Sequence, residues 1–343
     1  MFDYAEFPTS ERTDEWQVYT EAPTLGEGDT PLIDLAALAS EIGVSRLALK
    51  NEGANPTGSH KDRMSRLVVA RALDVGASTV SAASSGNAGV SLAAYAAHAG
   101  LKCVILSTRD IAQIWRHAIE MHGASLILTD TAEQRWTILG QRVRAGEWYP
   151  ATNFRVPAVG SNPFGVDGYR AIAFELFRLD RGMLTTDIIV PTSRGDLLWG
   201  IVRGFKDLRA GGYISKLPRV HAVEPFQRIS KVLAGADYRE TFPGNSALTS
   251  IGGTTVTFQA ISALRECKGT VVVAGENEAR DDQKRLARQG ILLELSSAAT
   301  LTGLRQLLRS GAVPADASVT LIGTARGFGG EVNRPEFAGG PLV

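Results

Sequence analysis

Residues 79–106 read TVSAASSGNAGVSLAAYAAHAGLKCVIL, and this stretch decides the fold. Small and β-branched residues at 79–83 predict a strand, and the Ala-rich run 88–98, closed by Gly100, predicts a helix. An apolar run at 102–106 predicts a second strand. A strand, a helix and a strand in this order build a parallel sheet through a right-handed crossover, so the stretch indicates an α/β protein.

The same alternation continues toward the C-terminus. Residues 111–121 predict a helix that ends at Gly123, and 125–128 predict a third strand of a small parallel sheet that extends to about residue 160. A second, larger sheet is predicted from further runs: strands at 187–191, 219–223, 269–273, 291–295 and 319–322, and a helix at 197–208. We therefore expect two domains, with parallel-rich sheets flanked by helices: a smaller one at 66–160, and a larger one formed by 1–65 and 161–343.

Composition favours an ordinary globular protein. The chain has 343 residues, 44% of them hydrophobic, and 36 basic residues balance 36 acidic ones, so neither a nucleic-acid nor a membrane surface is indicated. Residues 1–16 lack the pattern of a signal peptide, and no apolar run approaches the ~20 residues that span a bilayer. Cys103 and Cys267 lie in apolar runs and are expected to be reduced and buried. A cytoplasmic location is therefore expected.

Lys61 stands in the segment 53–63, GANPTGSHKDR, immediately before a run of helical periodicity. Ser59 and Asp62 are spaced as a capping box, which predicts that Lys61 lies in the first turn of a helix. A helix N-terminus repels cations and lowers the pKa of an amine, which suits a lysine that attacks a carbonyl group. For this residue taken alone, a solvated surface lysine is the alternative. A nucleotide-binding P-loop is excluded, because two residues separate its second glycine from the lysine.

The whole segment resembles the cofactor-lysine motif Asn-Pro-Thr-Gly-Ser-x-Lys-Asp-Arg of threonine synthases, within the fold type II, or tryptophan-synthase-like, family of pyridoxal 5′-phosphate (PLP) enzymes. Further segments resemble motifs of that family in the expected order: 25–32, 84–87, 162–163, 167–169, 173–175 and 294–299. The resemblance covers nearly the whole chain. It implies that PLP lies in the cleft between the domains, the larger binding its phosphate and the smaller, mobile one binding an amino-acid substrate.

The resemblance implies roles for two of these segments. Lys61 would carry PLP as a Schiff base and act as the catalytic base and acid. Ser84, Ser85, Gly86 and Asn87 would bind the substrate carboxylate, and Asn87 would also reach the oxygen on the PLP ring. The residues favour this role independently, because a turn between a strand and a helix directs N–H groups toward one point. A plain helix-capping turn is the alternative.

The segment 191–197, PTSRGDL, stands where the family places its Gly-rich phosphate loop. Five residues of this segment are expected to contact the cofactor: Ser193, Arg194, Gly195, Asp196 and Leu197. The arginine and the aspartate depart from the family pattern. Because a carboxylate repels a phosphate, we expect Arg194 to offset it and Asp196 to cap the following helix while pointing outward.

Residues 323–327, GTARG, follow the last predicted strand and are in register with the family's Thr-Gly-x-Gly. Thr324 would then face the pyridine nitrogen of PLP. A neutral hydroxyl cannot hold that nitrogen protonated as a carboxylate does. The ring would therefore be a weaker electron sink, which favours elimination of a leaving group over transamination.

The resemblance implies a homodimeric PLP-dependent carbon–oxygen lyase or synthase of amino-acid metabolism, which eliminates or replaces a group at Cβ or Cγ as threonine synthase does. The family carries an arginine, suited to a substrate phosphate, where this chain has Gly165. A serine/threonine dehydratase or a β-replacing synthase is therefore an alternative. A non-catalytic PLP-binding regulatory protein is another, because the phosphate loop is altered. The histidines show no metal-ligand spacing, so no metal is expected.

Overall fold

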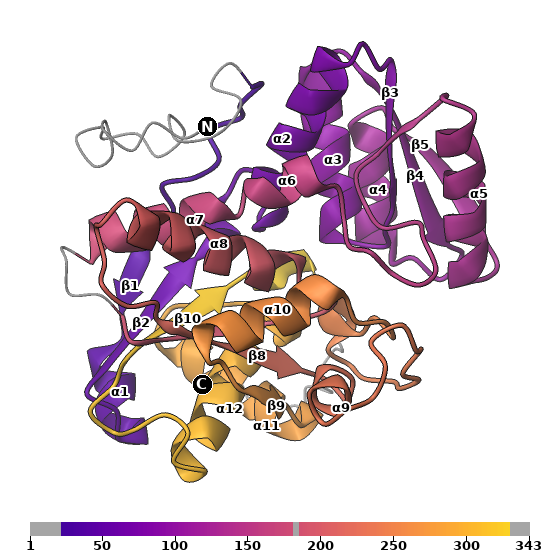
Figure 1. The fold of residues 1–343 in the computed structure, drawn as a ribbon. Coiled ribbons are helices and arrows are strands. Elements are labelled where there is room, and N and C mark those ends of the chain that lie inside the picture. Colours follow the sequence, from indigo (N-terminus) through magenta and orange to yellow (C-terminus); the bar gives the residue numbers. More distant parts are fainter. Residues whose placement is uncertain (1–21, 181–184, 330–343) are drawn as a thin grey trace, which may run out of the picture.

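The computed structural model describes residues 22–180 and 185–329, which fold around two β-sheets (Figure 1). In Figure 1 the smaller sheet, drawn in purple, lies at the upper right, and the larger sheet lies below it. The segment 1–16, for which no signal peptide is expected, lies outside the described residues. Within the described ranges, no helix has the length and apolar character needed to cross a membrane.

The larger sheet has six strands in the order β1-β2-β10-β7-β8-β9. Their bounds are Leu32–Asp34 (β1), Arg46–Asn51 (β2), Asp187–Pro191 (β7), Arg219–Glu224 (β8), Val271–Val273 (β9) and Ser318–Gly323 (β10). β1 pairs antiparallel with β2, and the other neighbouring pairs are parallel. Four of the five strands predicted for this sheet are thereby confirmed to within two residues at each end.

The strand predicted at 291–295 is wrong. Leu293 forms an isolated bridge with Arg326, and helix α12 (Leu295–Arg309) begins at the last residue of the predicted run. Ile291 and Leu293 are buried in the hydrophobic core that α12 also enters. The apolar character of this run therefore reflects a buried loop rather than pairing in a sheet.

Helices cover both faces of the larger sheet, because its central strands are apolar on both sides. Along β7, Ile189 packs into one core with Leu301 of α12, whereas Ile188 packs into the other core with Phe205. The first face also carries α1 (Ala36–Ile42) and α11 (Glu276–Arg288), and the second carries α7 (Arg170–Leu179), α8 (Asp196–Ala210), α9 (Ile229–Leu233) and α10 (Phe258–Cys267). Short 3-10 helices lie at Glu52–Ala54, Thr249–Ile251 and Gly327–Gly329. The helix predicted at 197–208 is confirmed as α8.

The smaller sheet has four parallel strands in the order β5-β4-β3-β6. Its strands are Thr79–Ala83 (β3), Lys102–Thr108 (β4), Ser125–Thr129 (β5) and Tyr149–Pro150 (β6), and the helices around it are α2 (Lys61–Asp74), α3 (Asn87–His98), α4 (Gln113–Met121), α5 (Ala132–Arg144) and α6 (Pro163–Asp167). The predicted alternation of strands and helices is confirmed here. Both cysteines are free and buried, as expected.

The domain boundaries themselves stay a prediction. All four strands of the smaller sheet lie between residues 66 and 160, while the boundary at residue 65 falls inside α2. One core cluster contains Ile188 of the larger sheet together with Val80 and Ile105 of the smaller one. The two sheets are therefore joined by a continuous set of buried apolar side chains.

Strands of both sheets direct their carboxyl ends toward one region. β3, β7 and β10 end at Ala83, Pro191 and Gly323, and the residues that follow each of them line the same cavity. Ligands of open α/β sheets bind at such ends, where the N-termini of the following helices also point.

Candidate active site

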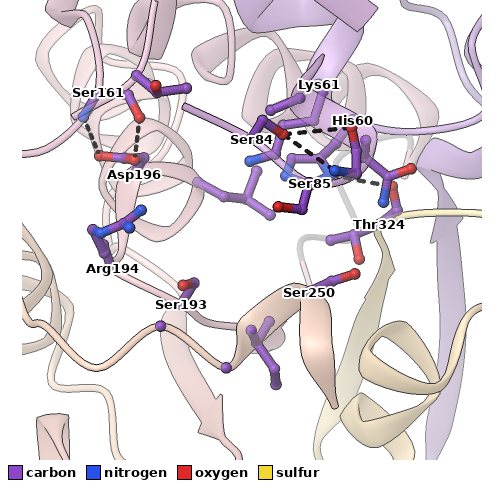
Figure 2. A pocket seen from close by; sticks show the side chains of 18 of the residues that line it. His60, Lys61, Ser84, Ser85, Ser161, Ser193, Arg194, Asp196, Ser250 and Thr324 are labelled. Carbon is purple, nitrogen blue, oxygen red and sulfur yellow. Dashed lines mark hydrogen bonds between the residues drawn. The ribbon is translucent and has the colours of Figure 1, made fainter. Parts of the chain in front are cut away.

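A cavity of about 420 Å³ lies between the loops that follow β3, β7 and β10 (Figure 2). Its size is in the range of small-molecule sites. Every residue predicted from the sequence to bind cofactor or substrate lines this cavity: Lys61, Ser84, Ser85, Gly86, Asn87, Ser193, Arg194, Gly195, Asp196, Leu197 and Thr324. The fold therefore brings four separate segments of the chain together, while the role of each residue stays a prediction.

The capping box predicted at Ser59 is wrong, although Lys61 does lie in the first turn of α2. The helix begins at Lys61, one residue later than the capping box requires, and the Ser59 hydroxyl accepts from the Lys61 N–H at 3.3 Å. The Asp62 carboxylate accepts instead from the N–H of Thr57, at 2.7 Å, and from its hydroxyl. Asp62 thus ties α2 to the turn that precedes it.

A buried charge network fixes the start of α2. The Nε of Arg63 lies 2.6 Å from Oε2 of Glu52, and its Nη1 lies 2.6 Å from Oε1 of Glu175 in α7. Lys50 of β2 also contacts Glu175, at 2.5 Å. Two buried cations balance two buried carboxylates, each of which would be costly to bury alone. Because Arg63 follows Lys61 by two residues, this network fixes the position of the helical turn that carries the lysine.

The amine of Lys61 lies at the cavity wall, where its Nζ is 3.4 Å from the hydroxyl oxygen of Tyr169. Burial lowers the pKa of Lys61; Asp196 and Glu294 raise it in part, and Arg194 lowers it further. Burial also raises the pKa of Tyr169 well above its usual value, so its phenol stays protonated. The Lys61 amine therefore becomes neutral, and able to attack a carbonyl carbon, at a lower pH than an exposed lysine.

The two serines after β3 are used differently. The Ser84 hydroxyl accepts from two N–H groups of its own turn, at 3.3 and 3.0 Å, and so stabilises the start of α3. The Ser85 hydroxyl accepts from Oγ of Ser107 at 2.7 Å and from Nη1 of Arg135 at 3.0 Å. Ser84 thus makes the contacts of a plain helix-capping turn, which is the alternative to substrate binding. Ser85 is instead hydrogen-bonded to side chains of β4 and α5.

Asn87, the first residue of α3, donates a hydrogen bond from Nδ2 to the Glu294 carboxylate at 3.1 Å. The same carboxylate oxygen accepts from the Ser250 hydroxyl at 3.1 Å. Burial raises the pKa of Glu294, although these two donors lower it in part. Glu294 begins a segment that resembles the family, yet its contact with Asn87 joins residues 207 positions apart and has no signal in the sequence.

The loop before α8 depends on Gly195. This residue has a φ of 103°, a left-handed conformation that favours glycine, and a Cβ there would lie 2.3 Å from the Cβ of Ala260. The prediction that Asp196 caps α8 and points outward is wrong, because Gly195 is the N-cap residue. The Asp196 carboxylate instead accepts from the N–H (3.1 Å) and the hydroxyl (2.7 Å) of Ser161, which lies beside it at the cavity wall (Figure 2).

Arg194 supplies a cation next to this loop. Its Nε donates to Oγ1 of Thr255 at 3.2 Å, and its guanidinium carbon lies 5.2 Å from the centre of the Trp136 ring. Burial lowers the pKa of Arg194, and Asp196 raises it in part. A guanidinium stays protonated at any physiological pH, so Arg194 can offset the charge of an anionic ligand.

The residues around α8 fit a phosphate group. The first N–H groups of a helix lack intrahelical partners and carry partial positive charge. The buried Arg228 donates to the carbonyl oxygens of Thr192, at 3.0 Å, and of Gly253, which ties together two loops of the cavity wall. With the Lys61 amine in the same cavity, the site offers partners for both the aldehyde and the phosphate of PLP.

Neutral groups surround Thr324 at the end of β10. Its Oγ1 lies 2.7 Å from Oγ of Ser297, which in turn accepts from the N–H of Ala325 at 3.1 Å. Nδ1 of His60 lies 3.1 Å from the carbonyl oxygen of Thr324. Burial lowers the pKa of His60 well below its usual value, so the imidazole is neutral. Thr324 thus presents a hydroxyl held by uncharged partners.

Comparison with known proteins agrees with this geometry. A family profile described as pyridoxal-phosphate dependent enzyme matches residues 23–324. The chain therefore belongs to this family of PLP-dependent enzymes. It is 31% identical to the threonine synthase of Methanocaldococcus jannaschii, over 89% of this chain and 76% of that protein. It is 30% identical to the threonine synthase of Mycobacterium tuberculosis, over 89% of this chain and 83% of that protein.

Solved structures share the fold. O-ureido-L-serine synthase superposes with a TM-score of 0.72 at 23% identity, covering 90% of this chain and 92% of that one. Diaminopropionate ammonia lyase from Escherichia coli superposes with a TM-score of 0.76 at 21% identity, covering 89% of this chain and 86% of that one. The predicted family, the fold type II α/β architecture and the PLP cofactor are thereby confirmed.

Proposed function

We propose that this chain is a PLP-dependent lyase or synthase that eliminates or replaces a group at Cβ or Cγ of an amino acid. The observation that carries the proposal is the Lys61 amine of lowered pKa, which lies in one cavity with the α8 N-terminus and the neutral Thr324. Identity of 31% to a threonine synthase supports the same class of reaction. A homodimer and a cytoplasmic location stay predictions.

The cofactor would be held at its aldehyde, its phosphate and its ring. The residues for these three parts are Lys61 for the aldehyde, Ser193, Arg194, Gly195 and Leu197 for the phosphate, and Asn87 and Thr324 for the ring. Asp196 would stand beside the phosphate, with its carboxylate bonded to Ser161. When bound, PLP supplies an electron sink that makes the Cα proton of an amino acid removable and lets a substituent leave. The Thr324 hydroxyl would keep that sink weak.

Lys61 would move the proton at the reacting centre. Its Nζ would accept the proton from Cα of the substrate and return it at the end of the cycle, as a general base and then a general acid. The lowered pKa of the Lys61 amine favours the unprotonated form that the first step needs. Tyr169, whose hydroxyl lies 3.4 Å from Nζ, would orient the amine without giving up its own proton, because burial raises the pKa of its phenol well above the usual value.

A dehydratase or a β-replacing synthase with a substrate that lacks phosphate is the second candidate. Gly165 favours it, because the resemblance to threonine synthases implies an arginine suited to a substrate phosphate at this position. A Cβ at Gly165 would lie 2.5 Å from Cγ2 of Val68 and 2.8 Å from Cγ of Met64, both in α2. A larger side chain cannot enter without moving α2, so a substrate phosphate would need a different partner.

The test is to incubate the PLP-loaded protein with O-phospho-L-homoserine, L-threonine, L-serine, or O-acetyl-L-serine plus sulfide, and to measure phosphate, 2-oxo acid and new amino acids. Phosphate release with threonine formation supports the threonine-synthase-like reaction, and 2-oxo acid with ammonia supports the dehydratase. Lys61→Ala is the inactive control. A protein that binds PLP yet converts none of these substrates contradicts the proposal and favours a regulatory PLP-binding function.

A further inference from the structure

Arg135 is a cation of the cavity wall that belongs to none of the motifs quoted above. It lies in α5, and its Nη1 donates to the Ser85 hydroxyl at 3.0 Å. Its Nε is buried and has no hydrogen-bond partner among residues 22–180 and 185–329. A buried donor without a partner is costly unless a ligand supplies an acceptor.

The surrounding charges leave Arg135 open to an anion. Burial lowers the pKa of Arg135, Arg194 lowers it further, and Asp110 and Glu133 raise it only in part. Within the described part of the chain, no carboxylate lies within ion-pair distance of Arg135 or Arg194. Two guanidinium groups thus repel each other near one cavity, and an anionic ligand would reduce this repulsion.

The contacts of Ser85 indicate where this anion would bind. A serine hydroxyl has two acceptor positions and one donor proton. Both acceptor positions of Ser85 are used, one by Ser107 Oγ–H and one by Arg135 Nη1–H. The Ser85 proton is therefore left to donate to a third group, and Ser85 lines the cavity beside Ser84 (Figure 2).

We propose that Arg135 binds the α-carboxylate of the amino-acid substrate together with Ser85, and that it makes the site prefer a free carboxylate over an uncharged group of the same shape. This inference rests on the proposed function. Arg135 acts in two ways: its guanidinium attracts the carboxylate directly, and its bond to Ser85 turns the serine proton toward the ligand. The turn at 84–87, which begins α3, adds the positive end of that helix.

The test uses PLP-loaded wild type, Arg135→Met and Arg135→Gln. Each is titrated with L-serine, L-threonine and the carboxamides of both, and binding is followed through the visible absorption of the lysine-bound cofactor. Wild type is expected to bind the acids more tightly than the amides. Both variants are expected to lose roughly 10- to 100-fold affinity for the acids, the range of one charge-assisted hydrogen bond, and little affinity for the amides.

Arg142→Met is the matched control, because Arg142 lies on the same helix but is exposed and pairs with Glu147 at 2.6 Å. It is expected to keep the wild-type preference. Arg135→Gln retains a polar side chain toward Ser85 and serves if Arg135→Met does not fold. Three results would overturn this inference alone. The Arg135 variants could keep the preference for acids, they could lose affinity for acids and amides equally, or they could lose affinity for PLP instead. A PLP-loaded wild type that responds neither to L-serine or L-threonine nor to O-phospho-L-homoserine contradicts the proposed function together with this inference.

Discussion

The side-chain amide of Asn87 donates to the carboxylate of Glu294 at 3.1 Å, and this bond joins the first residue of α3 to the residue before α12. One helix packs on the smaller sheet and the other covers the larger one. The two parts of the fold are therefore linked by side chains at the cavity itself. Asn87 would also contact the PLP ring, so Glu294 sets how that amide is presented.

Glu294→Gln is expected to remove a pH dependence of stability. Burial raises the pKa of Glu294 above its ordinary value of 4.5, so the folded protein binds a proton more tightly than the unfolded chain. The free energy of unfolding of wild type should therefore fall as pH rises from 4.5 through the raised pKa, and the variant should lack this fall. Urea denaturation of both apoproteins between pH 4.5 and 8 measures it. Parallel curves would show that Glu294 does not titrate in this way.

Two substitutions beside Lys61 should shift its pKa in opposite directions. Asp196 raises and Arg194 lowers the pKa of the Lys61 amine. Asp196→Asn should therefore make the amine neutral at a lower pH than in wild type, and Arg194→Met at a higher pH. The rate at which acetic anhydride labels Lys61 in the apoprotein, followed by mass spectrometry against pH, reports both shifts. Shifts of the same sign in the two variants would refute the charge argument.

Gly195→Ala should destabilise the protein far more than Gly212→Ala, at the other end of α8. Both glycines have positive φ, 103° and 78°. A Cβ at Gly195 would lie 2.3 Å from the Cβ of Ala260, whereas one at Gly212 meets nothing within 4 Å. We expect the free energy of unfolding to fall by about 2–5 kcal/mol for Gly195→Ala and by about 1 kcal/mol for Gly212→Ala. PLP affinity should fall only for Gly195→Ala; equal effects would argue against a shaped phosphate loop.

Glu175→Gln should weaken the network that holds α2. Burial alone would raise the pKa of Glu175, but Arg63 and Lys50 lower it overall, so its charge stabilises the fold above pH 4.5 and less as pH falls below that value. Removing the charge leaves two buried cations poorly compensated, which we expect to cost about 3–5 kcal/mol near pH 7.

The control for this network is Glu41→Gln, which breaks the exposed pair of Glu41 with Arg285. Exposed pairs contribute about 0–1 kcal/mol, so this variant should unfold close to wild type. Urea denaturation at pH 7 compares the two variants. A Glu175→Gln protein as stable as Glu41→Gln would show that the network adds no stability.

Local patterns predicted the elements well where a helix or strand has its own periodicity. The strands and helices between 79 and 128 follow from apolar runs and from the glycines that end the helices. The run 291–295 misled, because a buried loop and a buried strand have the same composition. The capping box predicted at Ser59 is wrong because the Asp62 carboxylate accepts a hydrogen bond from Thr57 instead. The outward-pointing cap predicted at Asp196 is wrong because its carboxylate accepts a hydrogen bond from Ser161, which lies beside it.

The sequence by itself determined the α/β class, the resemblance to the PLP family and the order along the chain of the loops that line the cavity, because these depend on short-range periodicity and on spacing within a motif; Lys61 as the cofactor lysine stays a prediction. Only the tertiary structure decided which distant side chains meet. Arg135 reaches Ser85 across 50 positions, and Glu294 reaches Asn87 across 207. Such contacts arise from strand order and helix packing, which bring chain segments together through their buried apolar faces. The apolar pattern of a segment does not indicate which polar side chains will lie next to it in the folded protein.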